Sequence, residues 1–311
     1  MKTLVIGAGG FVGGHLIKEL EDSGHEVVAS DVEAALPMLT ATGRMALAID
    51  ILEIVSIKKV FELSKPEWVI LLAAQSSVGR SWEDPLSTIR TNILGPVNIL
   101  EAIRELGIGP RVLLIGSSEE YGIVEDNGEP LVENRALAPA NPYAVTKSCQ
   151  EDFGRLYHRA YSLEIIMTRS FNHIGPGQRL GFVIPDFCSS IVAIERGEHE
   201  PVLRVGNLDA LRDFTDVRDV VRAYRFLLER GQAGEIYNVG TGHAVRIAMI
   251  LDILIRLARV PLQVEADPAR YRPVEVRSIV ADVGKIKKET GWRPEITLET
   301  SLADSLESWR R

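Results

Sequence analysis

The chain has 311 residues, 46% hydrophobic and 25% charged, which suits one large α/β unit or a dinucleotide domain with a smaller partner domain. A formal net charge of −8 disfavours nucleic acid and anionic membranes as partners, whereas local arginines can still hold a small phosphorylated ligand. No apolar run approaches the ~20 residues of a membrane span, and no signal-peptide pattern opens the chain. We therefore expect a cytoplasmic protein that contacts no membrane.

Strands and helices alternate through the first half of the chain. The strands are rich in Val, Ile and Leu without alternation, as in a parallel sheet buried on both faces. They are expected at Leu4–Ile6, Glu26–Ser30, Ala46–Ile49, Trp68–Ala73 and Arg111–Gly116. Helices are expected between them at Val12–Ser23, Ile54–Ser64 and Pro96–Leu106. This order predicts right-handed βαβ units and a doubly wound Rossmann sheet.

The second half begins with a long helix and then changes in texture. Asn141 is a good N-cap and Pro142 fits the first helical position, so a helix should run towards Tyr161, followed by a strand at Leu163–Thr168. Further elements are expected at Pro185–Arg196, Val202–Val205, Val220–Leu228, Ile236–Val239, Leu251–Ala258, Val264–Ala266 and Thr300–Trp309. We assign residues 1–171 to a dinucleotide-binding domain, to which 207–243 return. Residues 172–206 and 244–311 form a smaller C-terminal α/β substrate domain.

A glycine-rich loop joins the first strand to the first helix. Gly7, Gly10 and Gly13 have GxxGxxG spacing, and Phe11 and Val12 open the helix between the last two glycines. Glycine permits a tight turn and close approach of the backbone to a pyrophosphate at the helix N-terminus. Glycine-rich turns are common, but this position after the first strand predicts binding of NAD(H) or NADP(H).

Acidic residues follow the second and third strands. Asp31 lies about 20 residues after the loop, where a carboxylate accepts hydrogen bonds from the adenosine ribose and disfavours a 2′-phosphate. We therefore favour NAD(H), although Arg44 could accommodate NADP(H) and Asp31 could instead cap a loop. Asp50 and Ile51 are candidates for flanking the adenine, with a solvated turn as the alternative.

A tyrosine and a lysine share one face of the long helix. Tyr143 and Lys147 are four residues apart, and an ammonium beside a phenol should lower the pKa of the phenol. Ser117, at the end of the fifth strand, can hydrogen-bond the same substrate oxygen as Tyr143. Tyr143 and Lys147 alone could be a pair on the surface of a helix. Together with Ser117, and after a dinucleotide-binding loop, they predict redox chemistry. The two cysteines, Cys149 and Cys188, lie in no metal-ligand pattern, so we expect free thiols and no metal.

Several longer strings resemble the extended short-chain dehydrogenases/reductases that act on nucleotide sugars. They lie at residues 72–79, 117–122, 171–178, 205–214, 272–275 and 291–294, so the resemblance spans nearly the whole chain. Within that superfamily the chain is most similar to enzymes of GDP-mannose derivatives, above all to the reductases that form GDP-D-rhamnose from GDP-4-dehydro-6-deoxy-D-mannose. The resemblance implies a homodimer, with Ile99, Ile103 and Phe153 as candidate contacts that core packing explains equally well.

The resemblance also assigns roles to individual positions. It implies catalysis by Ser117, Tyr143 and Lys147. It places four further residues along the cofactor: Ala73, Ala74, Gln75 and Asn92. It assigns to the sugar nucleotide Ser118, Asn172, Val183, Arg212, Arg272 and Glu275. An acidic protein needs local cations for a diphosphate, and guanidinium binds phosphate through a bidentate fork, although each arginine could instead form a surface ion pair.

One residue leaves the reaction open. Glu119 occupies the position where related 4,6-dehydratases carry a catalytic base, and a simple ketone reduction needs no such group. By resemblance, three features favour a reductase. They are the 172–178 loop, the residues around Val183, and a chain that is shorter than the dehydratases of this group. The alternatives are GDP-mannose 4,6-dehydratase, a reductase that forms the talose epimer, a 4-epimerase, and a non-catalytic NAD(P) sensor.

Overall fold

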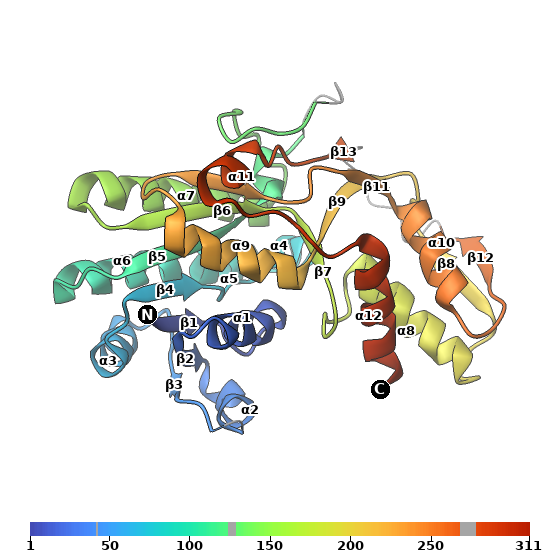
Figure 1. Cartoon of the computed structure of the whole chain (residues 1–311), viewed down its shortest axis with the longest axis horizontal. Coiled ribbons are helices and arrows are strands. Elements are labelled where there is room, and N and C mark those ends of the chain that lie inside the picture. The colour runs from blue at the N-terminus through green and yellow to red at the C-terminus, as the bar shows by residue number, and fades with distance from the viewer. Residues whose placement is uncertain (42, 124–128, 268–277) are drawn as a thin grey trace.

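The computed structural model describes residues 1–41, 43–123, 129–267 and 278–311, and its largest element is a seven-stranded sheet (Figure 1). Every neighbouring pair in this sheet is parallel, and the strand order is β10-β6-β5-β4-β1-β2-β3. The strands are β1 (Lys2–Ile6), β2 (Glu26–Asp31), β3 (Ala46–Ala48), β4 (Trp68–Leu71), β5 (Arg111–Ser117), β6 (Ile165–Ser170) and β10 (Ile236–Val239). Parallel strands must be joined by long crossover connections, which are usually helices, and this agrees with the helices that the sequence predicted between the strands.

Helices cover both faces of the sheet because side chains alternate along each strand. Val5 points into a core formed with α1 (Phe11–Asp22), α9 (Val217–Arg230) and α11 (Gly284–Thr290). Its neighbours Leu4 and Ile6 point into the opposite core, formed with α3 (Ile54–Ser64), α6 (Gly95–Leu106) and α7 (Pro142–Tyr161). The predicted fold class, a doubly wound Rossmann sheet with a smaller C-terminal α/β part, is confirmed.

The smaller part is built around a four-stranded and a two-stranded sheet. Its strands are β7 (Asn172–Ile174), β8 (Val202–Val205), β9 (Leu211–Asp216), β11 (Ala244–Arg246), β12 (Gln263–Ala266) and β13 (Ser278–Ile279). Its helices are α8 (Val183–Glu195), α10 (Ile247–Leu257) and α12 (Leu298–Arg310), which share a third apolar core. Figure 1 shows this part to the right of the seven-stranded sheet, with the C-terminus on α12.

The structure corrects several expectations. Of the segment 207–243, α9 and β10 join the Rossmann part, whereas β9 pairs with β7, β11 and β13. Two short helices and a π-helical turn that the sequence did not predict precede α6: α4 (Val78–Glu83), α5 (Pro85–Ile89) and η2 (Arg90–Leu94). Ile99 and Ile103 are fully buried in their own core and cannot contact a partner. Three further short elements are η1 (Glu33–Ala35), α2 (Leu36–Thr40) and η3 (Ser118–Tyr121).

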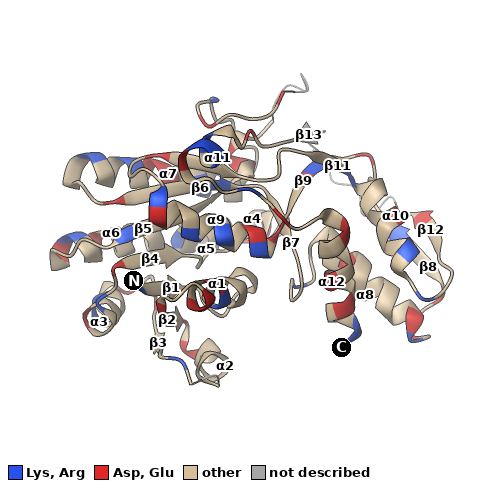
Figure 2. Cartoon of the chain, in the orientation of Figure 1, with Lys and Arg blue, Asp and Glu red and all other residues tan. Residues whose placement is uncertain are grey.

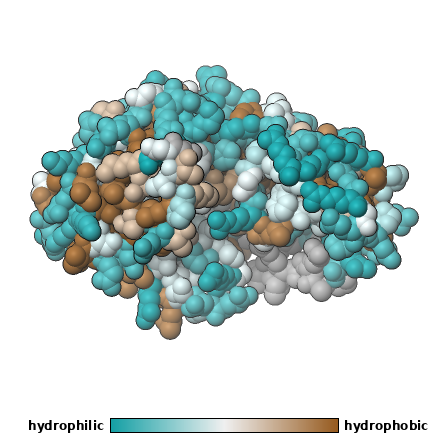
Figure 3. All heavy atoms as spheres, turned by 90° about the horizontal axis from the view of Figure 1, so that it is seen from below, coloured by the Kyte–Doolittle hydropathy of each residue, from teal (hydrophilic) through white to brown (hydrophobic). Residues whose placement is uncertain are grey.

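The surface carries charges of both signs. Figure 2 shows acidic and basic residues intermixed along the outer helices, as in the pair Glu101 and Arg104 on α6. Figure 3 shows hydrophobic side chains gathered toward the left end of one face, the end at which Figure 1 places α3 and α6. Among the helices that the structure describes, none combines the length and apolar character needed to cross a membrane.

Candidate active site

The loop between β1 and α1 forms a cradle that only glycine permits. Gly7 has φ +89°, and a Cβ there would lie 2.5 Å from the amide nitrogen of Ala73 on the neighbouring strand connection. A Cβ at Gly13 would lie 2.2 Å from the carbonyl oxygen of Ala8. Gly10 is the extended N-cap of α1, so the first helical amide groups face the space above the loop. This geometry fits a pyrophosphate group.

Asp31 lies at the rim of this cradle, where the sequence placed it. One carboxylate oxygen accepts a hydrogen bond from the Gly9 amide at 2.7 Å, and the other accepts one from the Val32 amide at 2.7 Å. Arg44 is bound to Glu21 through two hydrogen bonds of 2.6 and 2.8 Å. The guanidinium considered for a 2′-phosphate is therefore already paired.

Asn92 joins the next candidate segment to the catalytic helix. Its side chain is fully buried, accepts a hydrogen bond from the Gln75 amide at 2.8 Å and donates to the Gln75 carbonyl at 2.9 Å. It also donates to Thr146 Oγ1 on α7 at 3.1 Å. Ala73 and Ala74 precede Gln75 in the same connection after β4 and are half-buried. The four candidates therefore form one continuous strip that leads from the cradle to α7.

Asp50 and Ile51 do not share one environment. The Asp50 carboxylate is exposed and accepts a hydrogen bond from the Leu52 amide at 2.9 Å, which forms a solvated turn. Ile51 instead packs into the core between the sheet, α3 and α6. Phe11 and Val12 are half-buried at the start of α1, and the Phe11 ring stacks on His173 at 6.1 Å between centroids. No sequence pattern predicted this contact between the cradle and the segment after β6.

The structure brings Ser117 and Tyr143 together at the carboxyl end of β5. Asn141 caps α7 through a 2.8 Å bond from the Ala144 amide, which places Tyr143 in the first helical turn. Tyr143 is only 8% exposed, and a side-chain hydrogen bond connects it with Ser117. Lys147 lies one turn further on and donates to the Ile115 carbonyl at 2.7 Å and to Gln150 Oε1 at 3.2 Å.

The electrostatics of Tyr143 differ from the expectation. Burial raises the pKa of Tyr143 above its ordinary value, and the hydrogen bond with Ser117 opposes this only in part. The expected lowering of this pKa by Lys147 is wrong for the free enzyme, because the ammonium group is directed to Ile115 and Gln150. Burial lowers the pKa of Lys147 to about 8.

Glu119 stands beside the catalytic candidates. Its carboxylate accepts a hydrogen bond from Asn141 Nδ2 at 2.9 Å, and its charge acts to raise the pKa of Tyr143. Ser118, the preceding residue, is buried at 4% exposure. The glutamate is therefore close enough to influence Tyr143.

The candidates for the sugar nucleotide come from the smaller part. Asn172 on β7 is in register with Phe214 on β9, two residues from Arg212, so these polar side chains lie on adjoining strands. Val183 begins α8. Asp213, next to Arg212, accepts hydrogen bonds from the amides of Thr241, Gly242 and Ala281 and so fixes the end of β9. Arg272 and Glu275 lie outside the described residues.

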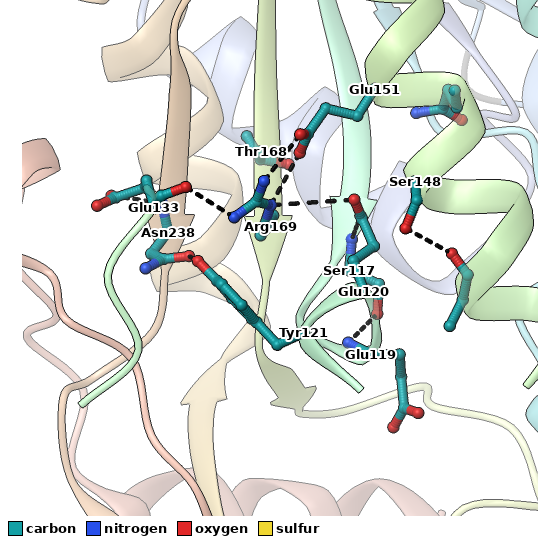
Figure 4. A network of polar contacts seen from close by, with 12 residues as sticks. Ser117, Glu119, Glu120, Tyr121, Glu133, Ser148, Glu151, Thr168, Arg169 and Asn238 are labelled. Carbon is teal, nitrogen blue, oxygen red and sulfur yellow. Dashed lines mark hydrogen bonds and ion pairs between the residues drawn. The ribbon is translucent and has the colours of Figure 1, made fainter. Parts of the chain in front are cut away.

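Sequence reasoning missed a buried polar network behind the site (Figure 4). Its centre is Arg169 on β6, which forms a bidentate pair with Glu151 on α7 at 2.8 and 2.8 Å. Glu120 lies beside it and accepts a hydrogen bond from the Ser117 amide at 2.7 Å. The Ser-x-x-Glu spacing of Ser117 and Glu120 is a capping-box pattern, and this signal was available in the sequence.

The fold and the site together define an extended short-chain dehydrogenase/reductase of the nucleotide-sugar type. The family described as GDP-mannose 4,6 dehydratase matches residues 4–305, and the chain belongs to this family. Over 308 residues the chain is 35% identical to the GDP-6-deoxy-D-mannose reductase of Pseudomonas aeruginosa, with 99% of this chain and 97% of the relative covered. It is also 30% identical to a Salmonella typhimurium dTDP-glucose 4,6-dehydratase over 340 residues, with coverages of 99% and 92%.

Solved structures give the same grouping. RMD from Pseudomonas aeruginosa complexed with NADPH superposes with a TM-score of 0.89 at 33% identity, covering 100% of this chain and 99% of that one. UDP-glucose 4-epimerase from Thermotoga maritima with UDP-glucose superposes with a TM-score of 0.88 at 28% identity and the same coverages. The fold is thus common to reductases, dehydratases and epimerases of nucleotide sugars, so the fold alone does not select the reaction.

Proposed function

We propose that the chain catalyses the NAD(P)H-dependent reduction of the 4-keto group of GDP-4-dehydro-6-deoxy-D-mannose, which forms GDP-D-rhamnose. The observation that carries this proposal is the full-length similarity to a GDP-6-deoxy-D-mannose reductase, at 35% identity. The dinucleotide cradle and the Ser117, Tyr143 and Lys147 side chains at the end of β5 support the same class of reaction.

The cradle fits the pyrophosphate of a nicotinamide dinucleotide. When bound, that cofactor supplies the hydride for the carbonyl carbon. Gly7, Gly10 and Gly13 leave room for the pyrophosphate, and Asp31 is placed to accept hydrogen bonds from the adenosine ribose. Because Asp31 is a carboxylate and Arg44 is paired with Glu21, we propose that NADH is preferred over NADPH.

The protein groups supply the proton and hold the substrate oxygen. We assign Tyr143 as the acid that protonates the developing alkoxide, with Ser117 donating a hydrogen bond to the same oxygen. Burial keeps the pKa of Tyr143 high, so the phenol retains its proton at neutral pH, as reduction requires. We assign Lys147 to holding the strand end that carries Ser117, through its hydrogen bond to the Ile115 carbonyl at 2.7 Å.

Substrate binding is assigned to the smaller part of the chain. We propose residues 172–206 and 244–311, together with β9, as the sugar-nucleotide domain, and residues 1–171 with α9 and β10 as the dinucleotide domain. Arg212 supplies a guanidinium for the diphosphate, while Asn172, Val183 and Ser118 line the approach to the sugar. Arg272 and Glu275 keep the same assignment from the resemblance alone.

A 4,6-dehydratase is the second candidate, and Glu119 is the observation that favours it. Its carboxylate lies beside Tyr143 and is held by Asn141, where a base could act on a neighbouring sugar carbon. Relatives of this chain include dTDP-glucose 4,6-dehydratases. The test offers GDP-mannose without reductant in one reaction and the 4-keto sugar with NADH in another. Net NADH oxidation supports the reductase, whereas a 4-keto product from GDP-mannose supports the dehydratase.

We also propose a homodimer in the cytoplasm. Large hydrophobic side chains are exposed on α5, η2 and α7, which pack against one another. These side chains are Leu86, Ile89, Leu94, Val145 and Leu156. A second copy of the chain that covers this surface would remove apolar area from water. Cys149 and Cys188 are free, which suits a reducing compartment.

A further inference from the structure

Four charged side chains are buried directly behind Ser117 and Tyr143. They are the carboxyl groups of Glu120 and Glu151, the guanidinium of Arg169 and the ammonium of Lys147, and none is more than 4% exposed. Two negative and two positive charges balance when all four groups are ionised. Buried charges are costly unless they are paired, so the pairing among these four groups decides which of them stays ionised.

Arg169 is largely committed to partners other than Glu120. Its Nε and Nη2 donate to Glu151, and its Nη1 donates to the Glu133 carbonyl at 2.9 Å. Its guanidinium also lies over the Tyr121 ring, 4.8 Å from the centroid. Glu120 Oε2 approaches Arg169 Nε only to 3.9 Å and accepts no hydrogen bond within the described part of the chain. Glu120 is therefore only partly compensated by Arg169 (Figure 4).

Glu120 and Lys147 both bind the same stretch of β5. Glu120 Oε1 accepts a hydrogen bond from the Ser117 amide, and a Cβ added to Gly116 would lie 2.5 Å from this oxygen. Lys147 Nζ donates to the carbonyl of Ile115, one residue earlier. Three consecutive residues of β5 thus connect the partly compensated carboxyl of Glu120 with Lys147 and Ser117.

Each of the two groups also favours the charged form of the other. Burial raises the pKa of Glu120 and lowers that of Lys147, and the opposite charge of each partner resists the other's shift. Arg169 also favours the Glu120 carboxylate, whereas Glu151 opposes it. Arg155 on α7 also pairs with Glu151, at 3.2 Å, and Glu119 and Tyr224 are titratable groups that act on Tyr143.

We propose that Glu120 is a positioning residue of this site, whose buried carboxylate holds the Ser117 end of β5 and retains Lys147 as an ammonium group. This inference rests on the proposed reductase function, because it assigns a task to the lysine beneath Tyr143. A purely structural role is the alternative, since Glu120 also completes the capping box of η3.

Glu120→Gln separates these two roles. The amide oxygen of glutamine can still accept from the Ser117 amide, while the negative charge is lost. We expect the alkaline limb of the pH profile of kcat/KM for ketone reduction to move to lower pH by about one unit, because Lys147 loses the charge that favours its ammonium form. The KM for NADH should change less than threefold. A profile that superimposes on the wild type would overturn the proposal.

Glu195→Gln is the matched control. Glu195 is a half-buried glutamate whose side chain is 8% exposed, and it pairs with Arg310 in the smaller part of the chain. This substitution removes a paired negative charge far from β5 and should leave the alkaline limb in place. An equal displacement in both variants would mean that the shift reports general destabilisation, and it would also overturn the proposal.

A second readout does not depend on turnover. Nitrogen NMR of lysine-labelled enzyme, with the Lys147 signal assigned through Lys147→Arg, gives the pKa of this group directly. We expect it to fall in Glu120→Gln; an unchanged value contradicts the proposal even if the wild type proves inactive on the 4-keto sugar. Should Glu120→Gln fail to fold, the wild-type titration decides. Two inflections in the Lys147 chemical shift as a function of pH support coupling to Glu120, and a single inflection excludes this coupling.

Discussion

Gly13 gives the sharpest test of the dinucleotide cradle. A Cβ at this position would lie 2.2 Å from the Ala8 carbonyl oxygen and 2.6 Å from its carbonyl carbon, and these backbone atoms cannot rotate away. Gly13→Ala must therefore push α1 away from the loop after β1. Overpacking of this kind costs about 3 kcal/mol. An unfolding entropy of about 2.1 cal/mol/K per residue makes each kcal/mol worth about 1.5 °C, so the melting temperature should fall by about 4–5 °C.

Gly14→Ala is the control within the same helix. A Cβ at Gly14 has nothing within 4 Å, so alanine should stabilise α1 by about 1 kcal/mol through its higher helix propensity. Thermal unfolding and NADH fluorescence titration measure both variants. We expect Gly13→Ala to weaken NADH binding at least about tenfold, since 1.4 kcal/mol in binding is already tenfold. Equal melting temperatures and equal NADH affinities in the two variants would refute the argument.

Four further predictions concern chemistry and assembly. Tyr143→Phe should reduce kcat by about two to four powers of ten and leave NADH affinity unchanged, and near-normal turnover would end its assignment as the acid. Asp31→Ser should raise kcat/KM with NADPH relative to NADH; an unchanged ratio would show that another residue selects the cofactor. Arg212→Ala should raise KM for the GDP-sugar about 10- to 100-fold, from the loss of a charge-assisted hydrogen bond worth about 1.5–3 kcal/mol, and an unchanged KM would place Arg212 outside the site. Leu86→Glu should dissociate the proposed homodimer in sedimentation velocity, whereas an unchanged sedimentation coefficient would exclude this surface as the interface.

The regular elements could be predicted because their signals are local. Val, Ile and Leu runs marked the buried parallel strands, and Asn141 with Pro142 marked the start of α7. The strands β7, β9 and β13 were missed because they are held by pairing with distant segments rather than by a pattern of their own. The segments α4, α5 and η2 were missed because each is too short to show helical periodicity.

The site could be predicted in its members but not in its electrostatics. The spacing of Tyr143 and Lys147 placed both side chains on one helix face, as the structure has them. The direction of the Tyr143 pKa was wrong because sequence spacing contains no information on burial, and burial is the largest cause of the shift. The pairing of Arg169 with Glu151 joins β6 to α7, and it follows only from the packing of α7 on the sheet.

The most direct measurement of the central claim follows the hydride itself. GDP-4-dehydro-6-deoxy-D-mannose is incubated with the enzyme and NADH that carries deuterium at C4 of the nicotinamide, and the sugar product is examined by NMR. The proposed function predicts one NADH oxidised for each sugar reduced, with deuterium at C4 of GDP-D-rhamnose. Unreacted 4-keto sugar in this mixture, together with conversion of GDP-mannose into that same sugar without net oxidation of NADH, would contradict the reductase and identify a dehydratase.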